Sequence, residues 1–179
     1  MINIRRATPE DLPKLQGANL INLAENYTMK YYYYHLLLWP SITYLAESVD
    51  GKVVGYVLTK MDEDSTIPFG HITSISVLRS YRRLGIATKL LRAAENSMIE
   101  CFGAEYVTLH VRESNKPARH LYEVTMGYKQ HSVDRKYYND GEDAIVMRHY
   151  LNISNLSNPD ASSDILDVWK SKHLVSTQA

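Results

Sequence analysis

The segment Val77–Ala87 has residue types that suit the binding of a phosphate group. It places Arg82 and Arg83 just before Gly85 and Ala87, and Gly85 opens a run with helical apolar spacing. The N-terminus of a helix presents unpaired backbone N–H groups and the positive end of the helix dipole, so it attracts anions. Gly85 and Ala87 leave room for the anion, and the two arginines add charge. The segment therefore predicts an anion site, although a basic loop that caps an ordinary helix has a similar composition.

A second residue suited to chemistry is His110. It lies in the alternating run Tyr106–Arg112, where it shares one face of a predicted strand with Thr108. The ordinary pKa of an imidazole lies near ~6.5, which suits proton transfer at neutral pH. A histidine in a strand is more often a packed core residue, so His110 is a candidate acid or base that needs support from its surroundings.

The apolar pattern predicts the elements that position these residues. Strands are expected at Ile2–Arg6, Thr43–Ser48, Val53–Met61, His71–Val77, Tyr106–Arg112, Tyr128–Lys136 and Ala144–Tyr150. Helices are expected at Pro9–Leu20 and Met29–Trp39, after Gly85, and at Pro117–Met126. This order predicts one mixed α/β (α+β) domain over residues 1–151. Residues 152–179 form a polar tail that we expect to be disordered.

The composition narrows the class of protein. The chain has 179 residues, of which 45% are hydrophobic and 22% charged, and its 20 basic residues balance its 20 acidic residues. A zero net charge argues against direct binding of nucleic acid. The single Cys101 cannot form an internal disulfide, which fits a reducing compartment. The sequence has no apolar run of ~18 residues and does not begin like a signal peptide, so we expect a cytoplasmic protein, with the nucleus as a second compartment, and no contact with a membrane.

Two motifs in this order resemble the GNAT acetyltransferase superfamily. The first is Arg82-x-x-Gly85-x-Ala87, between a strand and a long helix. The second is Asn115-x-x-Ala118-x-x-Leu121-Tyr122, followed by Gly127-Tyr128. The resemblance implies a GNAT fold, with a central, mostly antiparallel sheet flanked by helices, and acetyl-coenzyme A (acetyl-CoA) as co-substrate with no metal. By this resemblance the cofactor-binding residues are Ile75, Ser76, Val77, Arg82, Arg83, Gly85, Ile86, Ala87 and Asn115.

Further segments resemble the N-terminal acetyltransferases, in particular the catalytic subunit of NatA. They include Glu25-Asn26-Tyr27, Leu109-His110-Val111-Arg112 and Tyr137-Tyr138, and the likeness extends over Ile2–Tyr150. It implies a protein or peptide N-terminus as substrate, an auxiliary helical-repeat subunit and association with the ribosome. One departure is Ala24, where the family has proline, next to the expected peptide site.

The resemblance also implies roles for individual residues. An α-amine has a pKa near ~8, so it must lose a proton before it attacks the thioester directly. Glu25 and His110 are the candidate bases, acting directly or through water, and the Tyr122 hydroxyl is expected near the sulfur of coenzyme A. Backbone N–H groups of Ile75–Val77 would meet the thioester carbonyl oxygen. By this resemblance the substrate-binding residues are Glu25, Tyr27, Arg112 and Tyr138.

The acceptor is the main alternative left open. We expect small first residues such as Ser or Ala, and acidic ones when the chain acts without its partner. A GNAT enzyme that acetylates a ribosomal protein, a lysine or a small amine is a second hypothesis. A catalytically silent subunit that binds acyl-CoA is a third, against which the presence of Glu25, His110 and Tyr122 argues.

Overall fold

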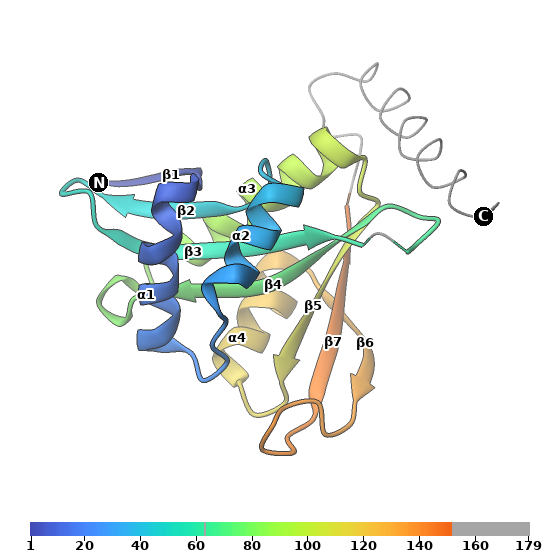
Figure 1. The fold of residues 1–179 in the computed structure, drawn as a ribbon. Helices are drawn as coiled ribbons and strands as arrows, with labels where there is room; N and C mark the ends of the chain where they lie inside the picture. Colours follow the sequence, from blue (N-terminus) through green and yellow to red (C-terminus); the bar gives the residue numbers. More distant parts are fainter. Residues whose placement is uncertain (63, 152–179) are drawn as a thin grey trace. The chain divides into compact units, whose positions relative to one another are not determined.

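The computed structural model describes residues 1–62 and 64–151 (Figure 1). Its strands are β1 (Ile2–Arg6), β2 (Tyr44–Ser48), β3 (Val53–Met61), β4 (Phe69–Val77), β5 (Tyr106–Arg112), β6 (Lys129–Asp134) and β7 (Ala144–Tyr150). Its helices are α1 (Leu12–Asn22), α2 (Met29–Leu38), α3 (Ile86–Phe102) and α4 (Lys116–His120), with short η1 (Pro9–Asp11), η2 (Arg79–Tyr81) and η3 (Leu121–Met126). Hydrogen bonds join these strands in the order β1-β2-β3-β4-β5-β7-β6. The expected mixed α/β fold is confirmed for the described residues.

The chain divides into two compact units. The first unit comprises residues 1–60 and 72–97, and the second comprises residues 61–71 and those from 98 onward. The predicted domain 1–151 contains all described residues of both units. The predicted disorder of the tail, residues 152–179, lies outside the described residues.

In the first unit, helices cover both faces of the sheet. The Tyr56 hydroxyl of β3 contacts Asn19 of α1, whereas a Cβ at the preceding Gly55 would touch Leu90 of α3. Neighbouring side chains in a strand point to opposite faces, so α1 and α3 lie on opposite sides of β3. This explains why nearly every residue of β3 is buried instead of every second one. β1 pairs with β2 and β2 with β3, both antiparallel, and Gly51 at φ 77° permits the predicted hairpin turn.

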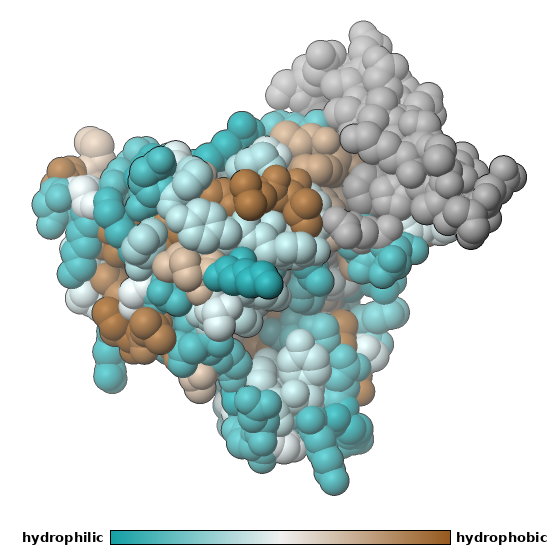
Figure 2. Space-filling view, viewed as in Figure 1, coloured by the Kyte–Doolittle hydropathy of each residue, from teal (hydrophilic) through white to brown (hydrophobic). Residues whose placement is uncertain are grey.

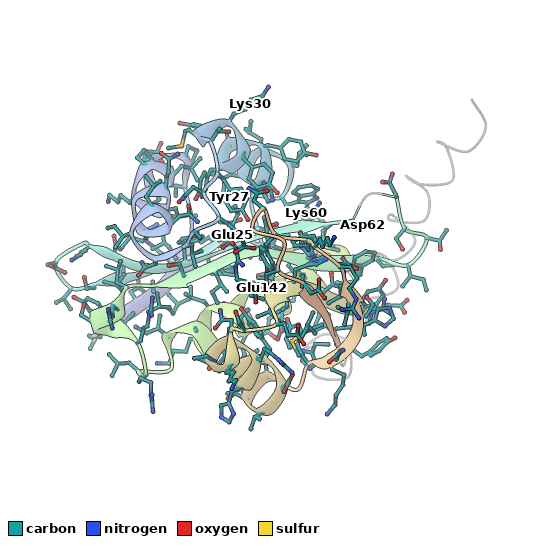
Figure 3. All side chains as sticks on the ribbon, turned by 90° about the horizontal axis from the view of Figure 1, so that it is seen from below. Glu25, Tyr27, Lys30, Lys60, Asp62 and Glu142 are labelled. Atoms are coloured by element: carbon teal, nitrogen blue, oxygen red, sulfur yellow. The ribbon has the colours of Figure 1, made fainter. Side chains whose placement is uncertain are left out.

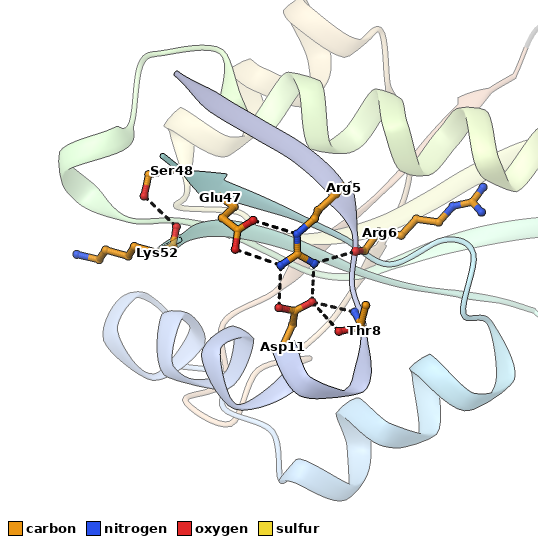
Figure 4. Close-up of polar contacts among 7 residues, drawn as sticks. All are labelled: Arg5, Arg6, Thr8, Asp11, Glu47, Ser48 and Lys52. Carbon is orange, nitrogen blue, oxygen red and sulfur yellow. Dashed lines mark hydrogen bonds and ion pairs between the residues drawn. The ribbon is translucent and has the colours of Figure 1, made fainter. Parts of the chain in front are cut away.

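Arg5 joins β1, η1 and β2 of the first unit in one charged cluster (Figure 4). Its guanidinium donates to both carboxylate oxygens of Asp11, at 2.6 and 2.9 Å, and to both of Glu47, at 3.1 and 3.2 Å. The Thr8 N–H also donates to Asp11, at 2.9 Å. The Arg5 guanidinium holds the pKa of Asp11 at about 2, well below the usual value for an aspartate. Planar, bidentate pairing of this kind fixes geometry as well as adding energy.

In the second unit, β7 pairs antiparallel with β5 on one side and β6 on the other. Val107, Leu109 and Val111 of β5 are buried, as the predicted alternation requires. Several predicted boundaries were wrong. β2 begins at Tyr44 instead of Thr43, β6 begins at Lys129 instead of Tyr128, and the α-helix predicted over Pro9–Leu20 extends over Leu12–Asn22. β4 begins at Phe69 instead of His71, and β6 ends at Asp134 because Lys136 turns the chain with φ 51°.

The helix predicted over Pro117–Met126 is not a continuous α-helix. It is α-helical to His120 and continues as the π-helical segment η3, which ends at Gly127 with φ 83°. The left-handed conformation at Gly127 favours glycine, as expected for the residue after a helix. The wider helical turn was not predictable from apolar spacing, and such turns are frequent at functional sites.

Candidate active site

The loop between α1 and α2 carries Glu25 and Tyr27 of the first unit. The Glu25 carbonyl accepts a hydrogen bond from Asn19 Nδ2 at 3.1 Å, and the Tyr27 hydroxyl donates to the Thr73 carbonyl of β4 at 3.4 Å. Glu25 and Tyr27 are both half-buried. Figure 3 shows Glu25 and Tyr27 on the side of the loop near the strands, with Lys30 of α2 pointing outward. A carboxylate and a phenol are thus held at the face of the first unit's sheet.

The Tyr27 side chain is fixed further by aromatic contacts. Its ring stacks on Tyr31 with a centroid separation of 4.8 Å. Below it, the fully buried His35 contacts the Tyr31 carbonyl through Nδ1 at 2.9 Å and the Thr73 hydroxyl through Nε2 at 3.0 Å. Burial lowers the pKa of His35, so it stays neutral. These contacts connect α2 to β4 and limit the positions open to Tyr27.

Ile75, Ser76 and Val77 form the end of β4, directly before the predicted anion loop. Ser76 is buried, and a Cβ built on Gly55 of β3 would lie 2.9 Å from the Ser76 carbonyl oxygen. Real side chains do not tolerate this distance from backbone, so Gly55 permits close approach of β3 to β4 here. The segment predicted to meet the thioester carbonyl is therefore a tightly packed backbone.

The loop Arg82–Ala87 has the geometry of an anion site. Arg83 and Gly85 have positive φ angles of 66° and 73°, and α3 begins at Ile86. The first bond of the helix runs from the Lys89 N–H to the Gly85 carbonyl, so the preceding N–H groups of α3 have no partner within the helix. A Cβ built on Gly85 would meet no atom within 4 Å. Exposed N–H groups at the positive end of a 17-residue helix can hold a phosphate.

Arg82 has a structural role that the sequence did not reveal. Its Nε donates to the Val77 carbonyl at 3.0 Å, and its Nη2 donates to Asn22 Oδ1 at 3.2 Å. Arg82 therefore connects the anion loop to the end of β4 and to the C-terminal end of α1. Arg83 is exposed as well. Its role in the anion loop would be to contribute positive charge.

In the second unit, a carboxylate and two rings hold His110. Its Nε2 lies 2.9 Å from Asp134 Oδ2, and its ring stacks on Tyr137 at 4.4 Å and meets the edge of His71 at 5.4 Å. His110 Nδ1 is buried, and no other described residue forms a hydrogen bond with it. If Nε2 carries the proton that faces Asp134, Nδ1 is the nitrogen that can accept one. This arrangement orients an imidazole for proton transfer.

Arg112 and Tyr138 form a charged and aromatic group in the second unit. The Arg112 guanidinium lies 3.9 Å from the centroid of the Tyr138 ring and contacts Asp140 at 2.8 Å and Glu142 at 2.6 Å. Hydrogen bonds from Ser114, and after them the Arg112 guanidinium, lower the pKa of Glu142 to about 2. Tyr137 meets the edge of Tyr138 at 5.1 Å, which connects this group to His110.

Asn115 and Tyr122 lie on the helical segment that follows β5. Asn115 caps α4, because its Oδ1 accepts from the Ala118 N–H at 3.2 Å. Tyr122 is buried in η3, with its ring 5.9 Å from Tyr128. Burial raises the pKa of the Tyr122 hydroxyl well above its usual value, so it stays protonated and can act as a hydrogen-bond donor.

The sequence of the acetyltransferase (GNAT) family matches residues 10–128, a span that contains the anion loop, Asn115 and Tyr122. The chain belongs to this family. Membership of this family confirms the predicted fold class. It also identifies the protein as an acetyltransferase, an enzyme that transfers acetyl groups.

Relatives at higher identity narrow the class of acetyltransferase. The N-terminal acetyltransferase A complex catalytic subunit NAA10 of Arabidopsis thaliana is 56% identical over 151 residues, covering 84% of this chain and 79% of that protein. The corresponding subunit ard1 of Schizosaccharomyces pombe is 45% identical over 166 residues, covering 92% and 94%. The acetyltransferase thus has the function of an N-alpha-acetyltransferase catalytic subunit, and the predicted resemblance is confirmed.

Solved structures agree with this placement. Naa20 of Chaetomium thermophilum in complex with a bisubstrate analogue superposes with a TM-score of 0.76 at 31% identity, covering 83% of this chain and 86% of that one. A chain of the NatB complex bound to CoA and MES superposes with a TM-score of 0.74 at 32% identity, covering 84% and 99%.

Sequence reasoning missed several residues of the acetyltransferase that contact the predicted ones. Asp134 and His71 touch His110, and Glu142 touches Arg112, each from a distant part of the sequence. Pairing of β6 with β7 and of β7 with β5 brings Asp134 near His110, and only a correct strand order would have indicated it. Among the described residues, no cluster of histidine, cysteine and acidic side chains could hold a metal, and no helix there is long and apolar enough to cross a membrane.

Proposed function

We propose that the acetyltransferase transfers the acetyl group of acetyl-CoA to the α-amino group of protein N-termini with small first residues such as Ser or Ala. The observation that carries this proposal is the 45–56% identity to catalytic subunits of the N-terminal acetyltransferase A complex. The likeness extends over 79% and 94% of the lengths of those two proteins, so it is not limited to one motif.

The anion loop fits the pyrophosphate of coenzyme A. Open space at Gly85, the free N–H groups of the first turn of α3 and the exposed Arg83 supply room, donors and charge. The NatB structure with CoA supports the assignment, because it shares this fold. Acetyl-CoA supplies the activated acyl group, and residues of this chain would hold its phosphates and orient it.

The chemistry requires the substrate amine to lose a proton and the departing sulfur to gain one. The amine nitrogen forms a bond to the acetyl carbon, and the bond from that carbon to sulfur breaks. Glu25 or His110 takes the proton from the amine, directly or through water. The protonated Tyr122 hydroxyl stabilises the thiolate that leaves, and backbone N–H groups of Ile75–Val77 stabilise the charge on the carbonyl oxygen. Each step uses an acid, a base or a donor, and none needs a covalent enzyme intermediate.

The choice of first residue follows from charge near the peptide site. A carboxylate at Glu25 repels an acidic first side chain, whereas Ser and Ala are neutral and small. Tyr27, Arg112 and Tyr138 are the other proposed substrate contacts. Ala24 lacks the ring constraint of proline, so a shift of this loop without a partner subunit would relax the preference toward acidic termini.

An exposed apolar surface of α1 and α2 supports the proposal of an auxiliary subunit. Leu20, Ile21 and Leu37 are 59%, 76% and 75% exposed, and Figure 2 shows brown, hydrophobic side chains over these two helices. Leu36 and Trp39, in contrast, pack into the core. Exposed apolar surface of this kind is typical of an interaction site. We propose that a helical-repeat subunit covers it, that the complex works at the ribosome, and that it acts in the cytoplasm and also in the nucleus.

The test is a peptide assay with purified protein and acetyl-CoA. We expect acetylation of peptides that begin with Ser and Ala, and weaker acetylation of those that begin with Asp, Glu or Met-Leu. Co-purification of an auxiliary subunit from native extract should shift activity further toward Ser and Ala. Acetylation of lysine side chains in N-terminally blocked peptides, without acetylation of free N-termini, would contradict the proposal.

A further inference from the structure

Asn19 of α1 is a fully buried polar residue whose amide contacts the loop that carries Glu25. Asn19 is 0% exposed, and its Nδ2 lies 3.1 Å from the Glu25 carbonyl oxygen and 3.0 Å from the Tyr56 hydroxyl. The Tyr56 hydroxyl lies 2.8 Å from Ser74 Oγ of β4. A chain of hydrogen bonds, partly buried at Glu25 and buried beyond it, therefore runs from the main chain of Glu25 to β3 and β4, all within the first unit.

The direction of the two hydrogen bonds from Asn19 is fixed. A carbonyl oxygen only accepts, so the NH₂ group of Asn19 must face Glu25. Both of its protons are then used, one by the Glu25 carbonyl and one by the Tyr56 oxygen. Either hydroxyl can donate in the bond between Tyr56 and Ser74, and burial raises the pKa of Tyr56, so it stays protonated.

If Asn19 served only for packing, burying its amide group would cost free energy without a compensating gain. Its Oδ1 is buried, and no described residue donates a hydrogen bond to it. An apolar residue such as leucine would avoid the desolvation of the amide group. What an apolar residue cannot supply is the pair of N–H donors that connects the Glu25 carbonyl to the Tyr56 hydroxyl.

Other contacts hold the loop beyond Glu25, because Gln16 Nε2 donates to the Tyr27 carbonyl at 3.1 Å. Leu23 ends α1 in an extended conformation, with φ −122° and ψ 146°, and Ala24 follows it with no ring to restrict its backbone. The hydrogen bond from Asn26 to the Ala24 carbonyl is exposed to solvent. The bond from Asn19, in contrast, comes from a fully buried side chain and reaches the main chain at Glu25 itself.

From this geometry we propose that Asn19 is a positioning residue for Glu25. It fixes the Glu25 backbone against β3 and β4, and thereby the place of the carboxylate that meets the substrate amine. The proposal rests on the proposed function, because it needs Glu25 to act on the substrate. A displacement of about 1 Å at a reacting group can lower a rate by about 100-fold.

The experiment compares Asn19→Ala with wild type in the peptide assay. We expect kcat/KM for a Ser-starting peptide to fall roughly 10-fold to 100-fold, with a lower kcat and a higher peptide KM, while acetyl-CoA affinity is unchanged. Tyr56→Phe removes the hydroxyl that Asn19 contacts but keeps the hydrogen bond from Asn19 to Glu25. Its kcat/KM should therefore fall less than that of Asn19→Ala. Thr59→Val is the matched control, because Thr59 is equally buried and donates to the Ile42 carbonyl at 2.6 Å, three positions beyond Tyr56 in β3.

A second variant separates positioning from stability. Leu23 already has the extended conformation that a following proline requires, so Ala24→Pro should stiffen the loop without strain there. In the Asn19→Ala background it should restore part of the lost kcat/KM. It should not rescue Thr59→Val, whose expected defect is in Tm only.

Two outcomes would overturn the proposal. One is a normal kcat/KM in Asn19→Ala, and the other is equal activity losses in Asn19→Ala and Thr59→Val at equal loss of Tm. Failure of the proposed function looks different, because wild type itself would then acetylate no free N-terminus.

Discussion

Each unit of the acetyltransferase contains an arginine between two carboxylates, but the two clusters differ in burial. In the first unit, Arg5 contacts Asp11, whose side chain is 6% exposed, and Glu47, which is 22% exposed. In the second unit, Arg112 contacts Asp140, which is 60% exposed, and Glu142, which is 26% exposed. The first cluster joins β1, η1 and β2, whereas the second lies beside Tyr138. An arginine between two carboxylates therefore stabilises the fold in the first unit. In the second unit, the same three charged groups lie at the surface beside a candidate site residue.

The candidate site residues follow the same division. In the first unit, Glu25, Tyr27 and Arg82 are fixed by hydrogen bonds to or from the main chain. In the second unit, His110 and Arg112 are fixed by carboxylate side chains. Exposed charge pairs are weak and are screened by salt, whereas the bonds at Glu25 and Tyr27 are partly buried and end on neutral main-chain carbonyls. Substitutions in the first unit should therefore have the larger effects.

The largest effect is expected for Glu25→Gln, which removes the base and its charge but keeps the side-chain shape. The maximal rate on a Ser-starting peptide should fall by roughly 100-fold or more if Glu25 is the principal base. Acetyl-CoA affinity should not change, because Glu25 does not belong to the anion loop. Steady-state kinetics with a direct binding measurement tests both statements. His110→Ala is the comparison, since a greater loss there would assign the base to the histidine.

The Arg5 cluster should contribute more to the free energy of unfolding than the Arg112 cluster, and its contribution should depend on pH. Arg5 lowers the folded-state pKa of Asp11 to about 2, below its unfolded value near 3.8, so the stabilisation is present above about pH 4. It is lost as the pH falls from about 4 to 2. At pH 7 Asp11→Asn should cost about 2 kcal/mol of unfolding free energy. Urea unfolding at pH 7 and pH 3 measures this, and the cost should be smaller at pH 3.

Asp140→Asn is the matched variant in the second unit. Because Asp140 is exposed, its loss should leave Tm unchanged, and added salt should have little further effect. Equal destabilisation by the two variants would contradict the comparison of buried and exposed clusters.

A smaller effect is expected for Gly85→Glu in the anion loop. The carboxylate repels phosphate, so the Kd for acetyl-CoA should rise by about tenfold, equal to about 1.4 kcal/mol of binding free energy. Gly51→Glu is the control, because Gly51 has a similar positive φ of 77° and the same open surroundings in the β2–β3 turn. Both variants should lose some stability from backbone strain. A cofactor defect in both, or in neither, would show that the anion loop is misassigned.

The sequence predicted those parts of the fold that depend on local pattern. β1, β3, β5 and β7 have the predicted ends, because alternating side chains and a turn such as Asp50-Gly51 determine them locally. The π-helical η3 was missed, since apolar spacing does not distinguish a slightly wider turn. Contacts such as Asn19 with Tyr56, or His110 with Asp134, join residues 37 and 24 positions apart. No local pattern encodes them, so the sequence named candidate residues but not what holds them in place.

The smallest expected effect on catalysis is that of Asp134→Asn. The Asp134 carboxylate can only accept a hydrogen bond, so it favours the His110 tautomer with its proton on Nε2 and leaves Nδ1 as the acceptor. An asparagine amide can instead donate to Nε2, which favours the tautomer with its proton on Nδ1 and removes that acceptor. The Asp134 side chain is 46% exposed, so water can partly replace it, and kcat should fall only about threefold to tenfold. Stopped-flow or steady-state rates at low and high salt measure the change. When Asp134→Asn is added to the Glu25→Gln variant, it should reduce the residual rate by the same factor if the two residues act independently. A loss as large as that of Glu25→Gln would mean that a partly exposed side-chain pair controls the reaction, and the division between the units would then be wrong.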